Sequence, residues 1–378
     1  MLGTIIEGAS VYDGVSPVPI RADVALADDR IVLIGALSER EAVERVDGRG
    51  LALAPGFIDV HSHSDELWLV DPRCEGKLVQ GVTTEIGGNC GTSVAPLHGL
   101  ARERKREDCA VYGLDAEWTN LDEFLSLVER NGVALNVATL VGLGTTRRCV
   151  RGDREGALER EEAAAQTALV RETVEMGALG VSSGLIYTPS RYADVAELAE
   201  CAVAAREAGA GRYVSHIRSE GDELLEAVDE GLDVARRAEV AVQFSHHKAA
   251  GKNNWGKVHR TLERMDRARQ RSGLAIHADV YPYVASWTDL ITILPDDVRD
   301  GGREPALERL RDPKTSIAIA LRLEMDWKGL WNDILITTVA SERNAELAGL
   351  RMDEIAERWR LTPARAAIRL LIEEHLET

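Results

Sequence analysis

Positive charge is in short supply in this sequence, and long apolar runs are absent. Lys and Arg number 45 against 63 Asp and Glu, which gives a net charge of −18 at pH 7. A protein that binds nucleic acid or an anionic membrane needs a basic face, so we expect neither partner. The sequence contains no run of about 18 apolar residues, so we expect no transmembrane helix. The opening MLGTIIEGASVYDG lacks the basic and apolar segments of a signal peptide.

Cysteine is also scarce, and its distribution is informative. The five cysteines are odd in number and widely scattered along the chain: Cys74, Cys90, Cys109, Cys149 and Cys201. A disulfide framework uses an even number of cysteines in a short secreted chain. We therefore expect a cytoplasmic protein without disulfides.

The remaining composition is that of a folded globular protein, with 45% hydrophobic and 29% charged residues. A length of 378 residues allows two or three domains, or one large barrel. Residues 1–54 read as short strands, because apolar and polar residues alternate there and Gly, Asp and Pro interrupt them. They form the first of two expected segments, and residues 55–378 form the second.

From Gly56 onward, apolar runs alternate with helical stretches rich in Ala, Glu and Arg. This pattern is typical of a parallel sheet or barrel, so the predicted fold class is α/β. Seven candidate strands follow one another: GFIDVHSH, VTTEIGGNCG, ALNVATLVG, LGVSSGLIY, RYVSHIRSE, VAVQFSHHK and AIHADVYPY. A closed (β/α)₈ barrel has eight strands. After Tyr283 the pattern loosens, and no clear eighth strand follows before Thr378.

A pair of histidines at the end of the first candidate strand is the strongest chemical signal. Alternate side chains of a strand share a face, so Asp59, His61 and His63 point the same way. Two imidazoles at the C-terminal end of a barrel strand can hold a metal ion. A surface or core histidine pair is the alternative, and the clean apolar strand before the pair favours the metal.

Three further residues close other candidate strands. Cys90 lies in GGNCGTS after the second strand, and His216 and His246 end the fifth and sixth strands. A buried cysteine is usually only a small apolar residue, and a single histidine is usually a packed or solvated one. Together at one rim, however, these residues indicate a metal site, because a metal ion lowers the pKa of a thiol.

Candidate substrate-binding residues follow the fourth, sixth and seventh strands. Tyr281 and Tyr283 share a face with Asp279, and their phenols could hold a carboxylate, although aromatic packing explains them equally well. Lys248 could bind a substrate carboxylate, although most lysines are simply solvated. A substrate loop is a further candidate in LIYTPSRYAD, with Tyr187, Arg191 and Tyr192.

As a set, the motifs resemble the D-aminoacylase branch of the amidohydrolase superfamily. The resemblance is carried, in order, by APGFIDVHSHSDE, QGVTTEIGGNCG, GVSSGLIYTPSRY, YVSHIRSEG, SHHKAAGKNNWGK and DVYPY. It implies a TIM-type (β/α)₈ barrel over residues 55–378, with the eighth strand missing, beside a small β-sandwich portion over residues 1–54. It also implies zinc-dependent hydrolysis of N-acyl-D-amino acids to a carboxylate and a free D-amino acid.

The resemblance further implies which residues form the site. Cys90, His216 and His246 match the ligands of a tightly bound zinc ion, and His61 and His63 match those of a weaker second position. The residues that fall near substrate-binding positions are Tyr192, Lys248, Tyr283 and Ser286. The zinc ion would polarise the amide carbonyl and lower the pKa of a bound water to about 7.

The general base is the one part that finds no match. The resemblance implies an Asp in a Ser-Asp-Gly-like motif on the eighth strand, and no such motif occurs after Tyr283. SERNAELAG and RLRDP are poor substitutes. We therefore leave the catalytic base unassigned and expect it to lie beyond Thr378, in a chain that is truncated at its C-terminus.

Two alternative functions stay open. A cyclic-amide hydrolase of the hydantoinase or dihydroorotase kind usually bridges its metal ions with a carboxylated lysine on the fourth strand, and GALGVSSGLIY contains no lysine. A non-catalytic metal-binding paralogue would keep the Cys and His residues without a base, and the missing Asp favours it. The oligomeric state is not predicted.

Overall fold

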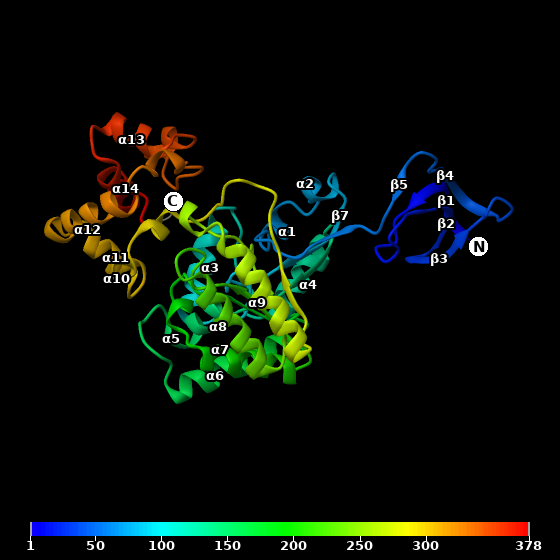
Figure 1. Cartoon of the computed structure of the whole chain (residues 1–378), viewed down its shortest axis with the longest axis horizontal. Helices are drawn as coiled ribbons and strands as arrows, with labels where there is room; N and C mark the ends of the chain where they lie inside the picture. Colours follow the sequence, from blue (N-terminus) through cyan, green and yellow to red (C-terminus); the bar gives the residue numbers. More distant parts are fainter. Residues whose placement is uncertain (1, 377–378) are drawn as a thin grey trace. The chain divides into compact units, whose positions relative to one another are not determined.

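The computed structural model describes residues 2–376 of the chain (Figure 1). These residues fall into two compact units. The first holds the chain up to residue 59 together with residues 75–84, and the second holds residues 60–74 and the chain from residue 85 onward. The short segment 60–74, which includes both histidines of the predicted pair, therefore belongs to the second unit.

The first unit is built on one five-stranded sheet with the order β3-β2-β1-β4, in which β5 also pairs with β1. β1 is antiparallel to β2 and parallel to β4 and β5. Ile5 of β1 pairs with Ala25 of β2, and both side chains are buried. The strands are β1 (Leu2–Val11), β2 (Ile20–Ala27), β3 (Arg30–Gly35), β4 (Ala42–Asp47) and β5 (Ala52–Leu53). The strands expected before residue 54 are present, and their membership of a β-sandwich stays a prediction.

The first unit also holds the start of the predicted barrel pattern. It contains β6 (Phe57–Asp59), α2 (Glu75–Leu78) and the beginning of β7 (Val82–Gly87). β7 continues into the second unit, where the Leu140 amide donates a hydrogen bond to the Gly87 carbonyl at 3.1 Å. β7 thus leads the chain from one unit into the other.

The second unit contains a parallel sheet with the order β13-β12-β11-β10-β9. Its five strands are β9 (Val141–Gly142), β10 (Val181–Gly184), β11 (Arg212–His216), β12 (Ala241–Phe244) and β13 (Ile276–Ala278). The strand β8 (Asn136–Thr139) precedes them in the chain and is not part of this sheet. Sequential neighbours pair in chain order, which is the arrangement expected of a barrel wall. Within residues 2–376, no strand follows β13, and Leu335 makes only an isolated bridge with Arg351.

Helices join these strands, and α6 to α9 pack side by side (Figure 1). Side-chain caps set their starts: the Asp194 carboxylate accepts the Glu197 amide at the start of α7, and Glu159 and Glu162 form a capping box at α6. The helices are α1 (Leu67–Val70), α3 (Gly99–Ala110), α4 (Leu121–Asn131), α5 (Leu143–Arg151), α6 (Arg160–Glu175), α7 (Val195–Glu207), α8 (Leu224–Ala238) and α9 (Lys257–Ser272), with 3₁₀ turns η1 (Ser190–Tyr192) and η2 (Lys252–Asn254).

The chain after β13 is helical and has a hydrophobic core of its own, in which Leu323, Ile355 and Leu371 are fully buried. Its elements are η3 (Leu290–Ile293), α10 (Asp296–Arg299), α11 (Arg303–Arg311), α12 (Pro313–Asp326), η4 (Trp331–Asp333), η5 (Glu342–Leu347), α13 (Met352–Trp359) and α14 (Pro363–Glu373). Across residues 2–376, no helix combines the length and the apolar character needed to span a bilayer.

Candidate metal centre

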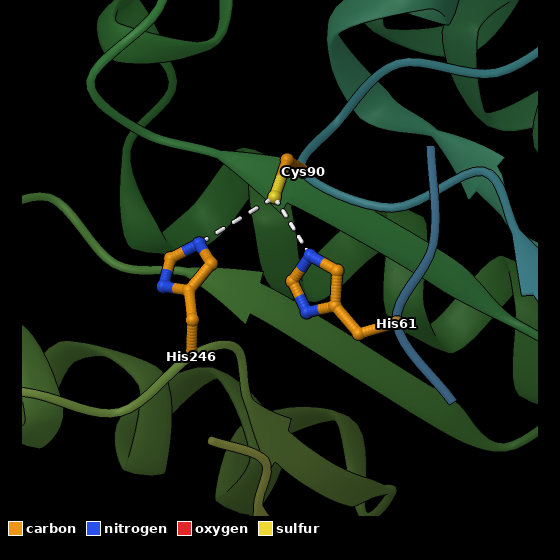
Figure 2. A group of neighbouring side chains, drawn as sticks. All are labelled: His61, Cys90 and His246. Carbon is orange, nitrogen blue, oxygen red and sulfur yellow. Dashed lines mark hydrogen bonds between the residues drawn. The ribbon is translucent and has the colours of Figure 1, made fainter. Parts of the chain in front are cut away.

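Four candidate ligands lie at or just after the C-terminal ends of strands. His216 is the last residue of β11, while Cys90, His61 and His246 follow β7, β6 and β12 within three residues. Neighbouring parallel strands end at the same edge of their sheet, so side chains at those ends can converge, as His216 and His246 do at or just after the ends of the paired strands β11 and β12. Figure 2 shows His61 and His246 pointing toward the Cys90 sulfur from either side.

The ligand atoms are close enough to share an ion. The Cys90 Sγ atom lies 3.3 Å from His61 Nε2 and 3.6 Å from His246 Nε2. On its other side, His246 Nε2 lies 2.9 Å from His216 Nδ1. Two groups of donor atoms within 4.8 Å of one another result, His61–Cys90–His246 and His216–Glu220–His246, and His246 belongs to both.

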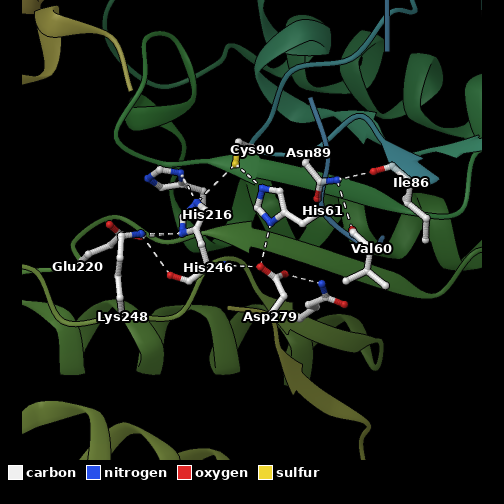
Figure 3. Close-up of polar contacts among 11 residues, drawn as sticks. Val60, His61, Ile86, Asn89, Cys90, His216, Glu220, His246, Lys248 and Asp279 are labelled. Atoms are coloured by element: carbon white, nitrogen blue, oxygen red, sulfur yellow. Dashed lines mark hydrogen bonds and ion pairs between the residues drawn. The ribbon is translucent and has the colours of Figure 1, made fainter. Parts of the chain in front are cut away.

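Two carboxylates orient the imidazoles from behind (Figure 3). Asp279 Oδ1 lies 3.0 Å from His61 Nδ1, and a Glu220 carboxylate oxygen lies 2.8 Å from His246 Nδ1. A neutral imidazole carries one N–H, so an Nδ1 that donates to a carboxylate leaves a lone pair on Nε2. Carboxylate–histidine pairs of this kind commonly support metal-ligating histidines. Both Nε2 atoms are therefore prepared to face a cation beside Cys90.

The electrostatics suit neutral imidazoles and a metal-bound thiolate. Burial lowers the pKa of His216 to about 3, and the neighbouring His246 adds to the effect. Burial raises the pKa of the Cys90 thiol, and the Asp279 and Glu220 carboxylates raise it further. A thiolate at Cys90 therefore needs a cation beside it, which a bound metal ion supplies.

The donor set fits zinc. Thiolate and imidazole are the ligands that Zn²⁺ prefers, in tetrahedral sites with an optional open position. The buried His216 side chain leaves its Nε2 atom without a hydrogen-bond partner in the described structure, and its Nδ1 atom faces the cluster. Cys90, His216 and His246 would hold the ion, and the adjacent His61 would serve a weaker second position.

A comparison with protein families assigns the chain to one of them. The model of an amidohydrolase family matches residues 44–315. The chain belongs to the amidohydrolase family. Among curated relatives, the N-acyl-D-glutamate deacylase of Alcaligenes xylosoxydans xylosoxydans is 38% identical over 301 residues, which cover 79% of this chain and 60% of the relative. The chain thus spans about three-fifths of the length of the curated relatives it matches.

Solved structures of D-aminoacylases are similar to this amidohydrolase. An N-acyl-D-glutamate deacylase from Bordetella bronchiseptica, complexed with zinc and a phosphonate mimic of the tetrahedral intermediate, is similar with a TM-score of 0.81 and 32% identity. The match covers 98% of this chain and 70% of that protein. A D-aminoacylase matches with a TM-score of 0.80 and 28% identity, over 98% of this chain and 70% of its own. The predicted resemblance and the TIM-barrel-type α/β fold are confirmed.

Two candidate ligands of this amidohydrolase have unusual backbone conformations. Cys90 has φ +52° and His246 has φ +36°, in the left-handed region that residues other than glycine rarely adopt. Strained residues of this kind concentrate at functional sites, where surrounding contacts hold them. Gly91 allows the turn after Cys90, because a Cβ atom there would lie 2.6 Å from the Gly184 amide nitrogen.

Buried carboxylates also hold the loops that carry the ligands. Glu85 is 1% exposed and accepts hydrogen bonds from the Trp68 indole, at 2.9 Å, and from the Ser62 hydroxyl. Asp65 accepts the Gly88 amide at 2.8 Å, two residues before Cys90. Burial raises the pKa of Asp65 to about 7, and the Glu66 carboxylate adds to this shift. These contacts fix the loops on either side of the site.

Four of the five predicted ligands belong to the two groups of donor atoms, and His63 does not. His61, Cys90 and His246 form one group of donor atoms, and His216 joins His246 in the other. The His63 ring lies 5.4 Å from the His61 ring, centroid to centroid, but His63 contributes to neither group. Burial lowers the pKa of His63 to about 4, so its imidazole is neutral at pH 7. A ligand role for His63 stays a prediction.

Of the four predicted substrate-binding residues, only Lys248 contacts the ligand cluster in the structure. Its ammonium lies 3.1 Å from His246 Nδ1. The Tyr192 hydroxyl instead donates to Asp300 at 3.2 Å and accepts the Gly301 amide at 3.0 Å. Tyr283 is 74% exposed, and Ser286 is exposed as well. Substrate contacts by these three residues stay predictions.

Sequence reasoning missed Glu220. Burial alone would raise the pKa of this carboxyl, but its hydrogen bond with His246 and the Lys248 ammonium lower the pKa to about 2. The available signal was its position four residues after His216 in HIRSE, which keeps it in the loop at the same strand end. An acidic residue in a polar loop is usually solvated, so the sequence alone did not single it out.

Proposed function

We propose that this chain carries the zinc-binding catalytic site of an N-acyl-D-amino-acid deacylase, which hydrolyses the amide to a carboxylate and a free D-amino acid. The observation that carries the proposal is the convergence of His61, Cys90 and His246 at the strand ends of a fold shared with D-aminoacylases. The relatives act on N-acyl-D-amino acids by name, which supports this substrate class for the present chain.

The chain's own residues have distinct roles in this proposal. A bound zinc ion would polarise the amide carbonyl and acidify water. Cys90, His216 and His246 would hold one ion tightly, and His61 and His63 would serve a weaker second position. Glu220 and Asp279 each bond to a ligand histidine, so we assign them to orientation and assign no residue of this chain as the general base.

Lys248 is proposed to receive the substrate carboxylate. Its ammonium is partly exposed and lies 5.4 Å from the centroid of the Tyr281 ring. Tyr192, Tyr283 and Ser286 are proposed as further substrate contacts. We also propose a cytoplasmic location, since no disulfide joins the five cysteines, all of which lie in the described part of the chain.

The test is a hydrolysis assay of the 378-residue chain with added zinc, against matched N-acetyl-D- and N-acetyl-L-amino acids and a hydantoin. Zinc content is measured on the same sample. D-selective release of amino acid is the expected result. Opening of the hydantoin without hydrolysis of N-acetyl-D-amino acids would overturn the proposal. Bound zinc without turnover of any substrate would reduce it to a metal-binding role.

A further inference from the structure

The Glu220 carboxylate lies between two functional groups of the site (Figure 3). Its Oε1 atom is 2.8 Å from His246 Nδ1 and 2.5 Å from Lys248 Nζ. The side chain is 17% exposed, so water competes little for these contacts. The backbone adds a further tie, because the Ala250 amide donates to the Glu220 carbonyl at 2.7 Å. One residue thus holds the loop that carries both His246 and Lys248.

The Nδ1 atom of His246 has two competing neighbours. Glu220 can only accept a hydrogen bond from it, whereas the Lys248 ammonium, 3.1 Å away, can only donate one to it. If Nδ1 donates to Glu220, the lone pair stays on Nε2 and faces Cys90 and His216. If Nδ1 instead accepts from Lys248, a neutral ring carries its proton on Nε2, and that nitrogen cannot bind a metal ion.

Glu220 is poorly placed to bind the same ion as Cys90. The two ring nitrogens of an imidazole face different directions, and Glu220 lies on the Nδ1 side of His246 while Cys90 Sγ lies on the Nε2 side. The carboxylate therefore acts on the cluster through the ring. Its second contact, with the Lys248 ammonium, is shorter than the distance from that ammonium to Nδ1 and holds Lys248 at the rim, where it also lies 3.2 Å from the His246 carbonyl.

We propose that Glu220 is a positioning residue that selects the metal-binding tautomer of His246 and, through the same oxygen, keeps Lys248 in place for the substrate carboxylate. The first role concerns zinc binding alone, and the second rests on the proposed deacylase function. Glu220 thereby links the metal position to the substrate position.

The first test is a double-mutant cycle read out as zinc affinity, by competition with a chelating dye. In Glu220→Gln, both the new side-chain amide and Lys248 can donate to Nδ1, so we expect zinc affinity to fall about 10- to 100-fold, as is usual when a group that orients a metal ligand is lost. Lys248→Met keeps the Glu220–His246 contact, and its zinc affinity should stay within about threefold of the wild type.

The double variant decides between positioning and a merely structural role. Once Lys248 is replaced, the amide carbonyl oxygen that Glu220→Gln introduces can accept from Nδ1, so zinc affinity should recover to within a few-fold of Lys248→Met. A double variant as weak as Glu220→Gln alone would overturn the proposal. Glu226→Gln, an exposed change on α8, is the matched control, and circular dichroism of every variant checks its folding.

The second readout is the affinity of zinc-loaded protein for N-acetyl-D-leucine. Glu220→Gln and Lys248→Met should each weaken binding about tenfold or more, since each removes a charged contact or its support. The double variant should bind no more weakly than Lys248→Met alone, and additive losses would overturn the substrate role. If the wild type does not bind the N-acyl amino acid, the proposed function fails, while the zinc cycle still tests the tautomer role.

Discussion

At the scale of single residues, the site depends on which atom of each side chain faces inward. The His61 and His246 rings turn Nε2 toward the Cys90 sulfur because Asp279 and Glu220 occupy Nδ1. A thiolate is the softest donor of this set and is matched to zinc. Cys90 is therefore the ligand whose loss should be most damaging.

The Cys90→Ala variant should lose zinc affinity by more than about 100-fold, which exceeds the loss typical of changes to groups that only orient a ligand. Equilibrium dialysis with zinc measures this directly. The matched control is Cys149→Ala on α5, whose half-buried thiol donates to the Pro96 carbonyl and belongs to neither ligand group. Wild-type zinc affinity in Cys90→Ala would show that this cysteine only packs.

At the scale of elements, the strand ends approach one another so closely that glycine is required. A Cβ atom at Gly91 would lie 2.6 Å from the Gly184 amide nitrogen, and one at Gly184 would overlap the Cys90 carbonyl oxygen. These are backbone atoms, which cannot rotate away as a side chain could. Because Gly91 and Gly184 have no side chains, the loop after β7 can lie directly against the end of β10.

The Gly91→Ala variant should be destabilised by about 2 to 5 kcal/mol, the sum of a left-handed backbone penalty and overpacking. Gly113→Ala is a matched control, because Gly113 also has a positive φ, of +69°, but a Cβ atom there meets nothing within 4 Å. The Gly113→Ala variant should lose only about 1 to 2 kcal/mol of unfolding free energy. Urea denaturation compares the two, and equal losses would contradict the close approach.

The C-terminal helices contain a second constraint at the element scale. Glu374, at the end of α14, is 2% exposed and accepts the Ser341 amide at 2.7 Å, the Ser341 hydroxyl at 2.6 Å and the Asn344 side-chain amide at 2.5 Å. Burial alone would raise the pKa of this carboxyl, but its hydrogen bonds with Ser341 and Asn344 lower the pKa below the ordinary value of 4.5.

The Glu374→Gln variant should lose about 1.5 to 3 kcal/mol of unfolding free energy at pH 7, the range for hydrogen bonds to charged groups. Because the folded state lowers this pKa, the contribution is present above pH 4.5 and is lost as the pH falls through the lowered pKa. The difference in unfolding free energy between the wild type and Glu374→Gln should therefore become smaller in denaturation experiments as the pH is lowered from 7. Glu357→Gln, exposed on α13, is the control and should change little at either pH.

At the scale of the whole molecule, the ligand cluster joins parts of the chain that lie far apart in sequence. His61, Cys90, His216 and His246 all lie in the second unit, at or just after the ends of four different strands. Unfolding that unit separates these ligands, so zinc that binds only the folded form stabilises it by mass action. Metal affinity and global stability are thus linked.

The melting temperature should therefore rise with zinc concentration, with about 2.7 kcal/mol gained when free zinc is about 100 times its dissociation constant. Differential scanning calorimetry with zinc and with a chelator measures the shift. Cys90→Ala should show almost no dependence on zinc. A melting temperature that ignores zinc in the wild type, or a shift of equal size in Cys90→Ala, would refute the link between this cluster and stability.

Much of the fold follows from local patterns in the sequence. Alternating apolar runs and helical stretches predicted seven strands, from GFIDV to AIHAD, and a strand is present in each of them, although ALNVATLVG contains two, β8 and β9. No strand follows β13 in the described chain, as the sequence pattern indicated. The parity of a strand and the position of residues at strand ends also indicated Cys90, His216 and His246 as neighbours. Such inferences succeed because burial of a strand and its side-chain alternation are encoded residue by residue.

Only the tertiary structure decided how these residues meet. It brought Glu220 and Asp279 behind the histidines, left His63 outside both ligand groups, and turned Tyr192 toward Asp300. Each outcome depends on side-chain rotation and on loops that pack across large sequence separations, and no local pattern records either. The sequence by itself determined where strands form and which residue types are the candidate ligands, whereas packing between distant loops determined which atom faces which partner.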